Sequence, residues 1–582
     1  MRLHAPGGTT SERRGVGSSE QAYKSIGIGS NVDRVTERDG HYVKTVDGNQ
    51  YTQCEMSRNG IRSFLVARGE DHSSVKTAMT SQYGETTRSP AGEVKDPEKS
   101  GGQDEAAEPK PGVARRLRDI LNKAVRASPV EIRGVLPVPL EERTSTRYSS
   151  YFSIWACMNI NLLPITFGML GPTYGLRMRD CALVILFFSL LTAAIPVYLG
   201  TLGPKTGLRQ MIQARYSFGR YLVSVPVILN LATLTGFCVI TCVVGGQCLS
   251  AVRDGSVSEA VGIVIIGLLA LLISFCGYDV LHQYERFAYI PALICFAVVA
   301  GCGGSHFKEQ ADAPPTTAKA VLSFGMIIAS YMIPYAALAS DFTTYLNPKF
   351  PSWRLFLYGY AGLVIPPVLL LTLGAAIGGA VPSVPEWAAG YEGHTVGGVL
   401  GAVLAPAGGF GKFVLVILSL TLLGNVSATM YSISLNFQIL IPQLVVVPRY
   451  VYSVVITAIV IPVSIRAATD FFLNLENFIA MIAYWSAAFV AVVIIEHVVF
   501  RRGRYETYDH DAWNCTSRLP LGIAALTSAT LSFALVIPCM NQMWYNGPIA
   551  VKTADIGFEM AFIVTAFLYL PLRALEKRYT GR

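Results

Sequence analysis

The sequence of 582 residues contains few charged residues for its length. Asp, Glu, Lys and Arg make up 15% of the chain, whereas a soluble globular protein carries about 25%. Hydrophobic residues make up 52%, and after residue 149 they form long runs separated by short charged segments. This composition excludes a water-soluble enzyme as a description of the whole chain. A helix needs about 20 apolar residues to cross a bilayer, so the sequence predicts an all-α polytopic membrane protein whose main partner is lipid.

The sequence also lacks the motifs of several functional classes. Its 11 cysteines include no Cys-x-x-Cys pair and most lie inside apolar runs, which excludes a disulfide framework and a metal site. The membrane part holds no nucleotide-binding loop and no catalytic triad signature. We therefore expect no cofactor, no metal and no enzymatic activity. The net charge of +8 comes from Lys and Arg beside apolar runs, which indicates anchored helix ends and not a nucleic-acid partner.

Composition divides the chain into four parts. Residues 1–112 are rich in Gly, Ser, Thr, Glu and Lys, show no sustained period, and are expected to form a disordered cytoplasmic tail. Met79 offers an alternative start, which would make residues 1–78 an extension of the gene model, and this question stays open. The remaining parts are a basic pre-membrane segment, a twelve-helix domain and a basic cytoplasmic C-terminal tail: 113–149, 150–573 and 574–582.

Apolar runs of spanning length predict twelve membrane helices. They lie near 151–171, 180–202, 222–247, 257–277, 280–303, 320–346, 354–378, 410–440, 449–466, 474–500, 520–539 and 555–573. When the segments between runs are assigned alternately to the two sides, Lys and Arg number twelve on one side and seven on the other. Because cytoplasmic segments carry the excess of basic residues, both termini are expected in the cytoplasm.

Two of these runs are interrupted at mid-depth by residues that break helices. The first contains Asn159, Asn161, Pro164 and Gly168, and the sixth contains Pro334. Proline removes a backbone donor, and unpaired backbone at membrane depth is tolerated only beside a cavity or inside protein. Interruptions in the first and sixth runs are typical of two inverted five-helix repeats that hold a substrate where the breaks meet.

Polar side chains inside apolar runs are costly, so each requires a reason. Glu285, at the start of the fifth run, could exchange a proton near neutral pH because partial desolvation raises the pKa of a carboxyl group. The neighbouring Arg286 equally supports a structural ion pair. Asn425, in the eighth run, must be hydrogen-bonded, either to a substrate or to another helix.

Three more residues are candidates on position alone. Phe237 and Thr241 lie one turn apart in the third run and face one neighbour, a spacing that favours plain packing. Tyr335 follows Pro334, and its ring could stack on a flat ligand or pack within the protein.

A set of short motifs then occurs in order along residues 130–582. They are Val130-Glu-Ile-Arg-Gly134, Glu141-Glu-Arg-Thr144, Gly203-Pro-Lys-Thr-Gly-Leu-Arg-Gln-Met211, Ala214-Arg-Tyr-Ser-Phe-Gly219, Val244-Gly-Gly-Gln247, Tyr284-Glu-Arg286, Leu475-Glu-Asn-Phe478, Tyr484-Trp485, Leu519-Pro-Leu-Gly-Ile-Ala-Ala525 and Asp555-Ile-Gly-Phe-Glu559. Together they resemble the fungal purine-cytosine permease branch of the nucleobase-cation-symport family.

The resemblance implies a fold and an activity. The fold is the leucine-transporter type, a 5+5 inverted repeat followed by two C-terminal helices. The activity is import of a nucleobase such as adenine, guanine, hypoxanthine or cytosine by proton symport, with sodium the less favoured ion. We expect this multi-pass protein in the plasma membrane, with no inference about its oligomeric state.

The resemblance also points to a site on the first, third, fifth, sixth and eighth runs. We expect eight substrate-binding residues there: Asn161, Phe237, Thr241, Gln283, Glu285, Tyr335, Asn425 and Thr429. Gln283, Glu285 and Asn425 match the family pattern, and Glu285 is expected to couple transport to a proton.

Four of the eight residues depart from the family pattern. Phe237 and Tyr335 stand where the family has Trp, and Thr241 and Thr429 stand where it has Asn. Each polar contact that a substrate loses costs about 1–3 kcal/mol, so the departures alter selectivity. Three alternatives therefore remain: a vitamin B6 carrier, a carrier of a specialised metabolite of similar shape, and a non-transporting receptor derived from the family.

Overall fold

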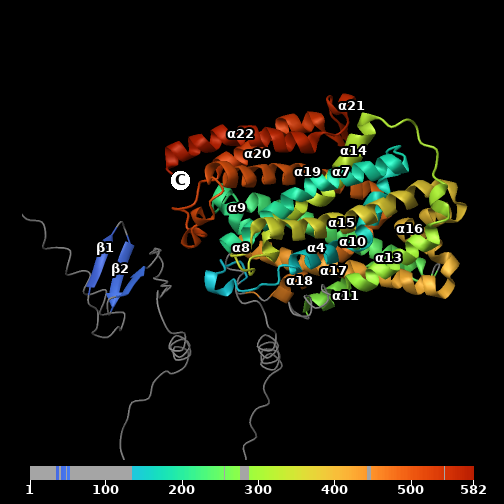
Figure 1. Ribbon diagram of the computed structural model, residues 1–582, viewed down its shortest axis with the longest axis horizontal. Coiled ribbons are helices and arrows are strands. Elements are labelled where there is room, and N and C mark those ends of the chain that lie inside the picture. The colour runs from blue at the N-terminus through green and yellow to red at the C-terminus, as the bar shows by residue number, and fades with distance from the viewer. Residues whose placement is uncertain are drawn as a thin grey trace, which may run out of the picture. The chain divides into compact units, whose positions relative to one another are not determined.

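The computed structural model describes residues 134–253, 256–275, 288–441, 447, 449–542 and 544–582, together with three short strands nearer the N-terminus (Figure 1). The chain divides into two units, Met1–Pro109 and Lys110–Arg582, and each is described by itself.

The first unit contains a small antiparallel sheet. Its strands are β1 (Arg34–Arg38), β2 (His41–Val46) and β3 (Asn49–Thr52), in the order β1-β2-β3. Valine, threonine and tyrosine, which favour strands, recur in them, and Asp-Gly dipeptides separate them in the sequence. These strands were not expected from the sequence, and the disorder expected for residues 1–112 stays a prediction.

The second unit is helical, and its α-helices follow in chain order. They are α4 (Ser150–Asn159), α5 (Leu162–Gly168), α6 (Leu170–Thr173), α7 (Met178–Gly200), α8 (Leu202–Thr206), α9 (Gln210–Phe218), α10 (Ser224–Ala251), α11 (Glu259–Phe275), α13 (Tyr289–Gly303), α14 (Ala318–Met332), α15 (Ser352–Ala380), α16 (Pro385–Leu404), α17 (Gly408–Leu440), α18 (Arg449–Ala467), α19 (Phe471–Ile495), α20 (Ile523–Cys539), α21 (Ala550–Thr553) and α22 (Gly557–Thr580).

Short elements connect the helices. They are the 3-10 turns η1 (Leu140–Glu142), η2 (His306–Lys308), η3 (Ile333–Ala337), η4 (Ala339–Phe342), η5 (Val381–Ser383), η6 (Ala405–Ala407), η8 (Ala468–Asp470), η10 (Tyr505–Thr507) and η11 (His510–Ala512), the π-helical η9 (Glu496–Phe500), and the paired strands β4 (Asn541–Gln542) and β5 (Tyr545–Asn546).

The described residues contain seven helical stretches long and apolar enough to cross a membrane, or eight if the bent first pair counts as one span. Three shorter apolar helices accompany them: Glu259–Ser274, Tyr289–Gly303 and Ile523–Cys539. Each of the twelve runs expected from the sequence overlaps a described α-helix. The count of twelve crossings itself stays a prediction.

Two helices differ from the expected boundaries. The predicted C-terminal tail, 574–582, is helical up to Thr580 because α22 continues without a break. Helix α16 fell between the expected seventh and eighth spans and was not predicted. It bends at Thr395, whose φ is +44°, and its two halves approach so closely that a Cβ on Gly398 would lie 1.9 Å from the carbonyl oxygen of Gly390.

Helix α10 is the centre of the packing. It contacts α17, α11, α16 and α18 along its length, and buried residues line it from Pro226 to Ser250. On one side of the unit α20 and α22 lie side by side and pack on α19 (Figure 1). Elsewhere α15 packs against α4, α5 and α7.

The contact between α5 and α15 is made by glycine backbones. A Cβ on Gly168 would lie 2.0 Å from the carbonyl oxygen of Leu371, and one on Gly374 would lie 2.2 Å from that of Ile165. Neither neighbour is a flexible side chain that could move aside. The close approach fixes α5 against the long helix α15.

Helices α8 and α9 hold the ends of two other elements. Arg209 donates to the carbonyl oxygen of Asp341 in η4, and the backbone N–H of Gln210 donates to the Asp341 carboxylate at 2.8 Å. Arg215 donates to the carbonyl oxygen of Ile439 at 3.1 Å, at the C-terminus of α17. Burial lowers the pKa of Arg215 to about 10, so it remains charged at neutral pH and complements the negative end of the helix dipole.

We predict that Gly168→Val lowers the stability of the protein by about 1–3 kcal/mol, because two backbones would have to separate. The measurement is the melting temperature of the detergent-solubilised protein. Gly301→Ala is the matched control, since a Cβ at Gly301 meets nothing within 4 Å. Equal melting temperatures for the two variants would contradict the proposed role of the close approach.

Candidate functional site

The first predicted break lies between α4 and α5. Helix α4 ends at Asn159 and α5 begins at Leu162, with a bend of 58° between them. The Asn161 carboxamide accepts a hydrogen bond from the backbone N–H of Leu163 at 2.8 Å and donates one to the carbonyl oxygen of Met158 at 2.7 Å. The break therefore precedes Pro164, which sits in the first turn of α5 where a backbone N–H has no helical partner anyway.

The second predicted break lies at the end of α14. The helix stops at Met332 and the chain continues as η3, with Pro334 in its first turn, and then as η4. The two broken segments are in contact. The Asn159 carboxamide oxygen accepts from the Tyr331 hydroxyl at 2.6 Å, and the ring centroids of Trp155 and Tyr335 are 5.1 Å apart.

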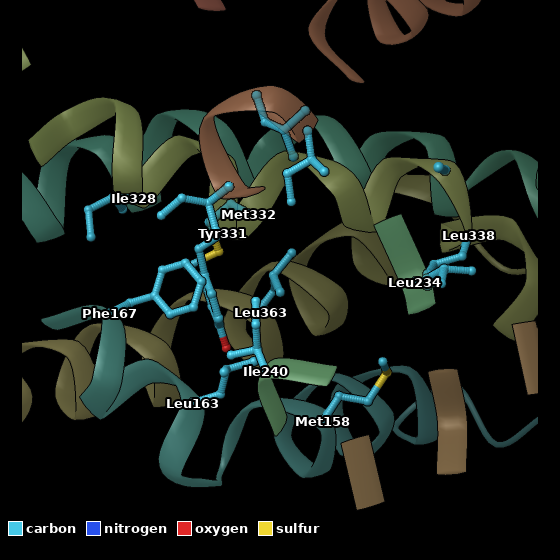
Figure 2. Close-up of a cluster of buried hydrophobic side chains, with 14 of the residues drawn as sticks. Met158, Leu163, Phe167, Leu234, Ile240, Ile328, Tyr331, Met332, Leu338 and Leu363 are labelled. Carbon is cyan, nitrogen blue, oxygen red and sulfur yellow. The ribbon is translucent and has the colours of Figure 1, made fainter. Parts of the chain in front are cut away.

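A small cavity lies between these two breaks, α10 and α17. Its lining consists of Met158, Leu234, Phe237, Tyr331, Pro334, Tyr335, Leu338, Asn425 and Thr429. Figure 2 shows several of these side chains within a larger cluster of buried apolar residues. The cavity has a volume of about 20 Å³, enough for about one water molecule and too small for a heterocyclic ring. In this conformation the candidate site is closed.

The structure brings four of the eight predicted site residues together around this cavity: Phe237, Tyr335, Asn425 and Thr429. Their role in binding stays a prediction. Asn425 also donates to the carbonyl oxygen of Met158 at 2.9 Å. Of the two interpretations that the sequence left open for this amide, the contact between helices is present in the closed form, and the hydrogen bond to a substrate stays a prediction.

Two other predicted residues have local partners. Asn161 caps α5 as described, and Thr241 donates to the carbonyl oxygen of Phe237 in its own helix at 2.6 Å. Both are fully buried, and neither is among the residues that line the cavity. Gln283 and Glu285 lie outside the described residues.

The sequence analysis missed several lining residues. Met158, Leu234 and Leu338 are apolar residues in apolar runs, so no pattern distinguishes them. Tyr331 carried a usable signal, because it lies one turn before Tyr335 and ahead of the same proline. For Asn159 the sequence predicted a part in the helix break and no part in the site.

A larger groove of about 660 Å³ lies next to the cavity, between α10, α18 and α19. Apolar residues line most of it, and Arg466, Asp470 and Asn474 supply its polar side chains. The Phe478 ring, which lines the groove, contacts the Phe237 ring of the cavity edge-on, with centroids 5.7 Å apart. These two rings are the contact between groove and cavity.

The chain is similar in sequence to known permeases and transporters. Residues 137–564 match the family described as "Permease for cytosine/purines, uracil, thiamine, allantoin". The purine-cytosine permease fcyB of Emericella nidulans is 35% identical over 461 residues, covering 78% of this chain and 90% of that protein. The vitamin B6 transporter TPN1 of Saccharomyces cerevisiae is 26% identical over 577 residues, covering 88% of this chain and 98% of that protein.

A solved structure shows the same fold. It is Mhp1, a nucleobase-cation-symport-1 family transporter in a closed conformation with bromovinylhydantoin bound, with a TM-score of 0.57, 17% identity, and coverage of 77% of this chain and 96% of that chain. The family match spans most of the sequence and contains both helix breaks and all the cavity residues. The chain therefore belongs to the family of permeases for cytosine/purines, uracil, thiamine and allantoin, and it is a multi-pass membrane transporter rather than an enzyme.

Proposed function

We propose that this permease imports a small flat heterocycle, most favourably a purine nucleobase or cytosine, by proton symport. The observation that carries the proposal is the closed cavity between the two broken segments, lined by the rings of Phe237 and Tyr335 and by the amide of Asn425. Aromatic faces suit a flat ring, and an amide can pair with both donors and acceptors at its edge. The family membership and the relative fcyB support the substrate class.

We propose the matching architecture of twelve spans, with two inverted five-helix repeats followed by two C-terminal helices. The breaks at Asn161 and at Pro334, in the first and sixth runs, support it. The excess of basic residues on one side supports cytoplasmic termini, and a plasma-membrane location fits uptake.

Transport in this proposal proceeds by alternating access. The cavity must enlarge to admit a ring between Phe237 and Tyr335, because its closed volume is about 20 Å³. Asn425 and Thr429 then bind the edge of the ring, with Gln283 and Glu285 from the fifth run. Coupling requires that the proton and the substrate each bind one conformation more tightly than the other. The coupling free energy is the same whether it is measured as the effect of the proton on substrate binding or as the effect of the substrate on proton binding. Glu285 is the proposed proton carrier.

A second candidate is a vitamin B6 carrier. The relative TPN1 favours it, and the replacement of two expected tryptophans by Phe237 and Tyr335 leaves room for the substituents on the pyridine ring of vitamin B6. Its lower identity makes it the weaker candidate. A carrier of a specialised metabolite and a receptor that binds without flux are the remaining alternatives.

Uptake by cells that lack their own carriers tests the substrate class. We expect saturable uptake of labelled hypoxanthine, adenine or cytosine that an excess of unlabelled nucleobases inhibits and an excess of pyridoxine does not. Inhibition by pyridoxine but not by nucleobases would assign vitamin B6 as the substrate class in place of a nucleobase. Binding of a nucleobase to the purified protein without flux in vesicles would identify a receptor.

Proton coupling has its own test in the same cells. We expect uptake to fall as external pH rises and to collapse with a protonophore, while replacement of sodium has no effect. Glu285→Gln should abolish uptake at an unchanged surface level, because a neutral amide cannot carry the proton. The control is Glu386→Gln, at an exposed acid in the first turn of α16. If uptake by Glu285→Gln still falls as external pH rises, Glu285 is not the group that couples transport to the proton.

Substitution of Asn425 tests the site itself. We expect Asn425→Ala to weaken substrate affinity by roughly 10-fold or more, because the edge of the ring loses a buried partner. Asn436→Ala is the matched control: Asn436 is another buried amide on the same helix, bonded to the carbonyl oxygen of Ser432 at 2.8 Å, and it does not line the cavity. Equal effects of the two substitutions would show a packing role for Asn425.

A further inference from the structure

Asn159 is joined by hydrogen bonds to two tyrosines that line the cavity, Tyr331 and Tyr335. Asn159 is fully buried, and its amide nitrogen donates to the carbonyl oxygen of Trp155 at 2.7 Å. Its carboxamide oxygen accepts from two hydroxyl groups, that of Tyr331 at 2.6 Å and that of Tyr335 at 3.4 Å. One acceptor therefore serves two phenol donors that both line the cavity.

The two hydrogen bonds differ in quality. Hydroxyl-to-oxygen bonds in proteins measure about 2.5–3.0 Å, so the bond from Tyr331 is normal and the bond from Tyr335 is long and weak. A buried hydroxyl gains little from a bond of that length. The Tyr335 hydroxyl would consequently donate to an acceptor in the cavity that lies closer than the oxygen of Asn159.

Packing fixes where that donor points. The Tyr335 ring stands edge-on to Trp155, at 5.1 Å and 73°, and to Tyr331, at 6.1 Å and 89°. The side chain of Asn425 lies beside the Tyr335 hydroxyl. The ring cannot tilt freely, but the O–H can rotate about its C–O bond from Asn159 toward the cavity without moving any heavy atom.

We propose that the Tyr335 hydroxyl is a specificity-determining donor. The heterocycle stacks on the Phe237 ring and turns an edge toward Tyr335, whose hydroxyl donates to an unprotonated ring nitrogen beside the amide of Asn425. Asn159 and Tyr331 are positioning residues: Tyr331 occupies the oxygen of Asn159 and so leaves the Tyr335 hydroxyl available. This inference rests on the proposed function, since it assigns the chemistry by which that site recognises a flat ring.

The experiment measures the affinities of adenine and of 1-deaza-, 3-deaza- and 7-deazaadenine for the purified protein by thermal shift, with competition for uptake as the second measurement. Each analogue replaces one ring-nitrogen acceptor with C–H. We expect Tyr335→Phe to weaken adenine roughly 5- to 15-fold, the contribution of about one neutral hydrogen bond. One deaza analogue, the one that lacks the acceptor read by Tyr335, should bind the variant and the wild type equally.

The variant Tyr331→Phe tests the positioning role. It removes the competing donor, so the Tyr335 hydroxyl should bond more strongly to Asn159. The preference for adenine over the same analogue should then shrink several-fold. The control is Tyr151→Phe, a fully buried tyrosine of α4 that does not line the cavity, and it should leave the preference intact.

The outcomes separate this inference from the proposed function. If wild-type protein binds none of these rings, the nucleobase assignment fails and the inference fails with it. If wild-type protein binds adenine and Tyr335→Phe weakens adenine and all three analogues equally, or none of them, the hydroxyl reads no acceptor and the inference alone is overturned. The melting temperature of the ligand-free Tyr335→Phe variant is measured beside that of the wild type, and equal values show that the variant is folded when its binding is compared.

Discussion

The structure depends on how the backbone groups freed at the first helix break are satisfied. A peptide group buried away from water without a partner costs a few kcal/mol, so a helix can be interrupted in the interior only where side chains replace the lost bonds. The carbonyl oxygen of Met158 accepts from Asn161, two residues after the end of α4, and from Asn425 on α17. A single carbonyl group thus joins the break to a distant helix, and the cavity forms beside that junction.

Other contacts hold the broken segments in position. The glycine backbones of α5 and α15 fix the second half of the first span, because no side chain separates them. Arg209 holds η4 through Asp341, and Arg215 holds the end of α17 through Ile439. Helix α17, which carries Asn425 and Thr429, is therefore anchored away from the cavity, and the proposed opening of the site has to leave these anchored points in place.

The chemistry of the cavity follows from residues that differ from the family pattern. Phe237 and Tyr335 keep flat surfaces but are smaller than tryptophan, and Thr429 offers a hydroxyl in place of an amide. Tyr335 adds a phenol whose bond to Asn159 is long, and the same oxygen of Asn159 also accepts from Tyr331. The proposed change in selectivity requires no change in the helices that form the cavity.

The sequence by itself determined the class of protein, the helical segments and the interrupted runs, because apolar length and helix-breaking residues act locally. It also indicated Phe237, Tyr335, Asn425 and Thr429, through the resemblance of motifs. The tertiary structure decided the rest: the break covers Ile160 and Asn161 and precedes Pro164, α16 is a bent helix, and Asn159 is the shared acceptor of two tyrosines. These features depend on partners from segments far apart in the chain, such as Met158 with Asn425, and local sequence carries no record of which distant group satisfies a buried polar atom.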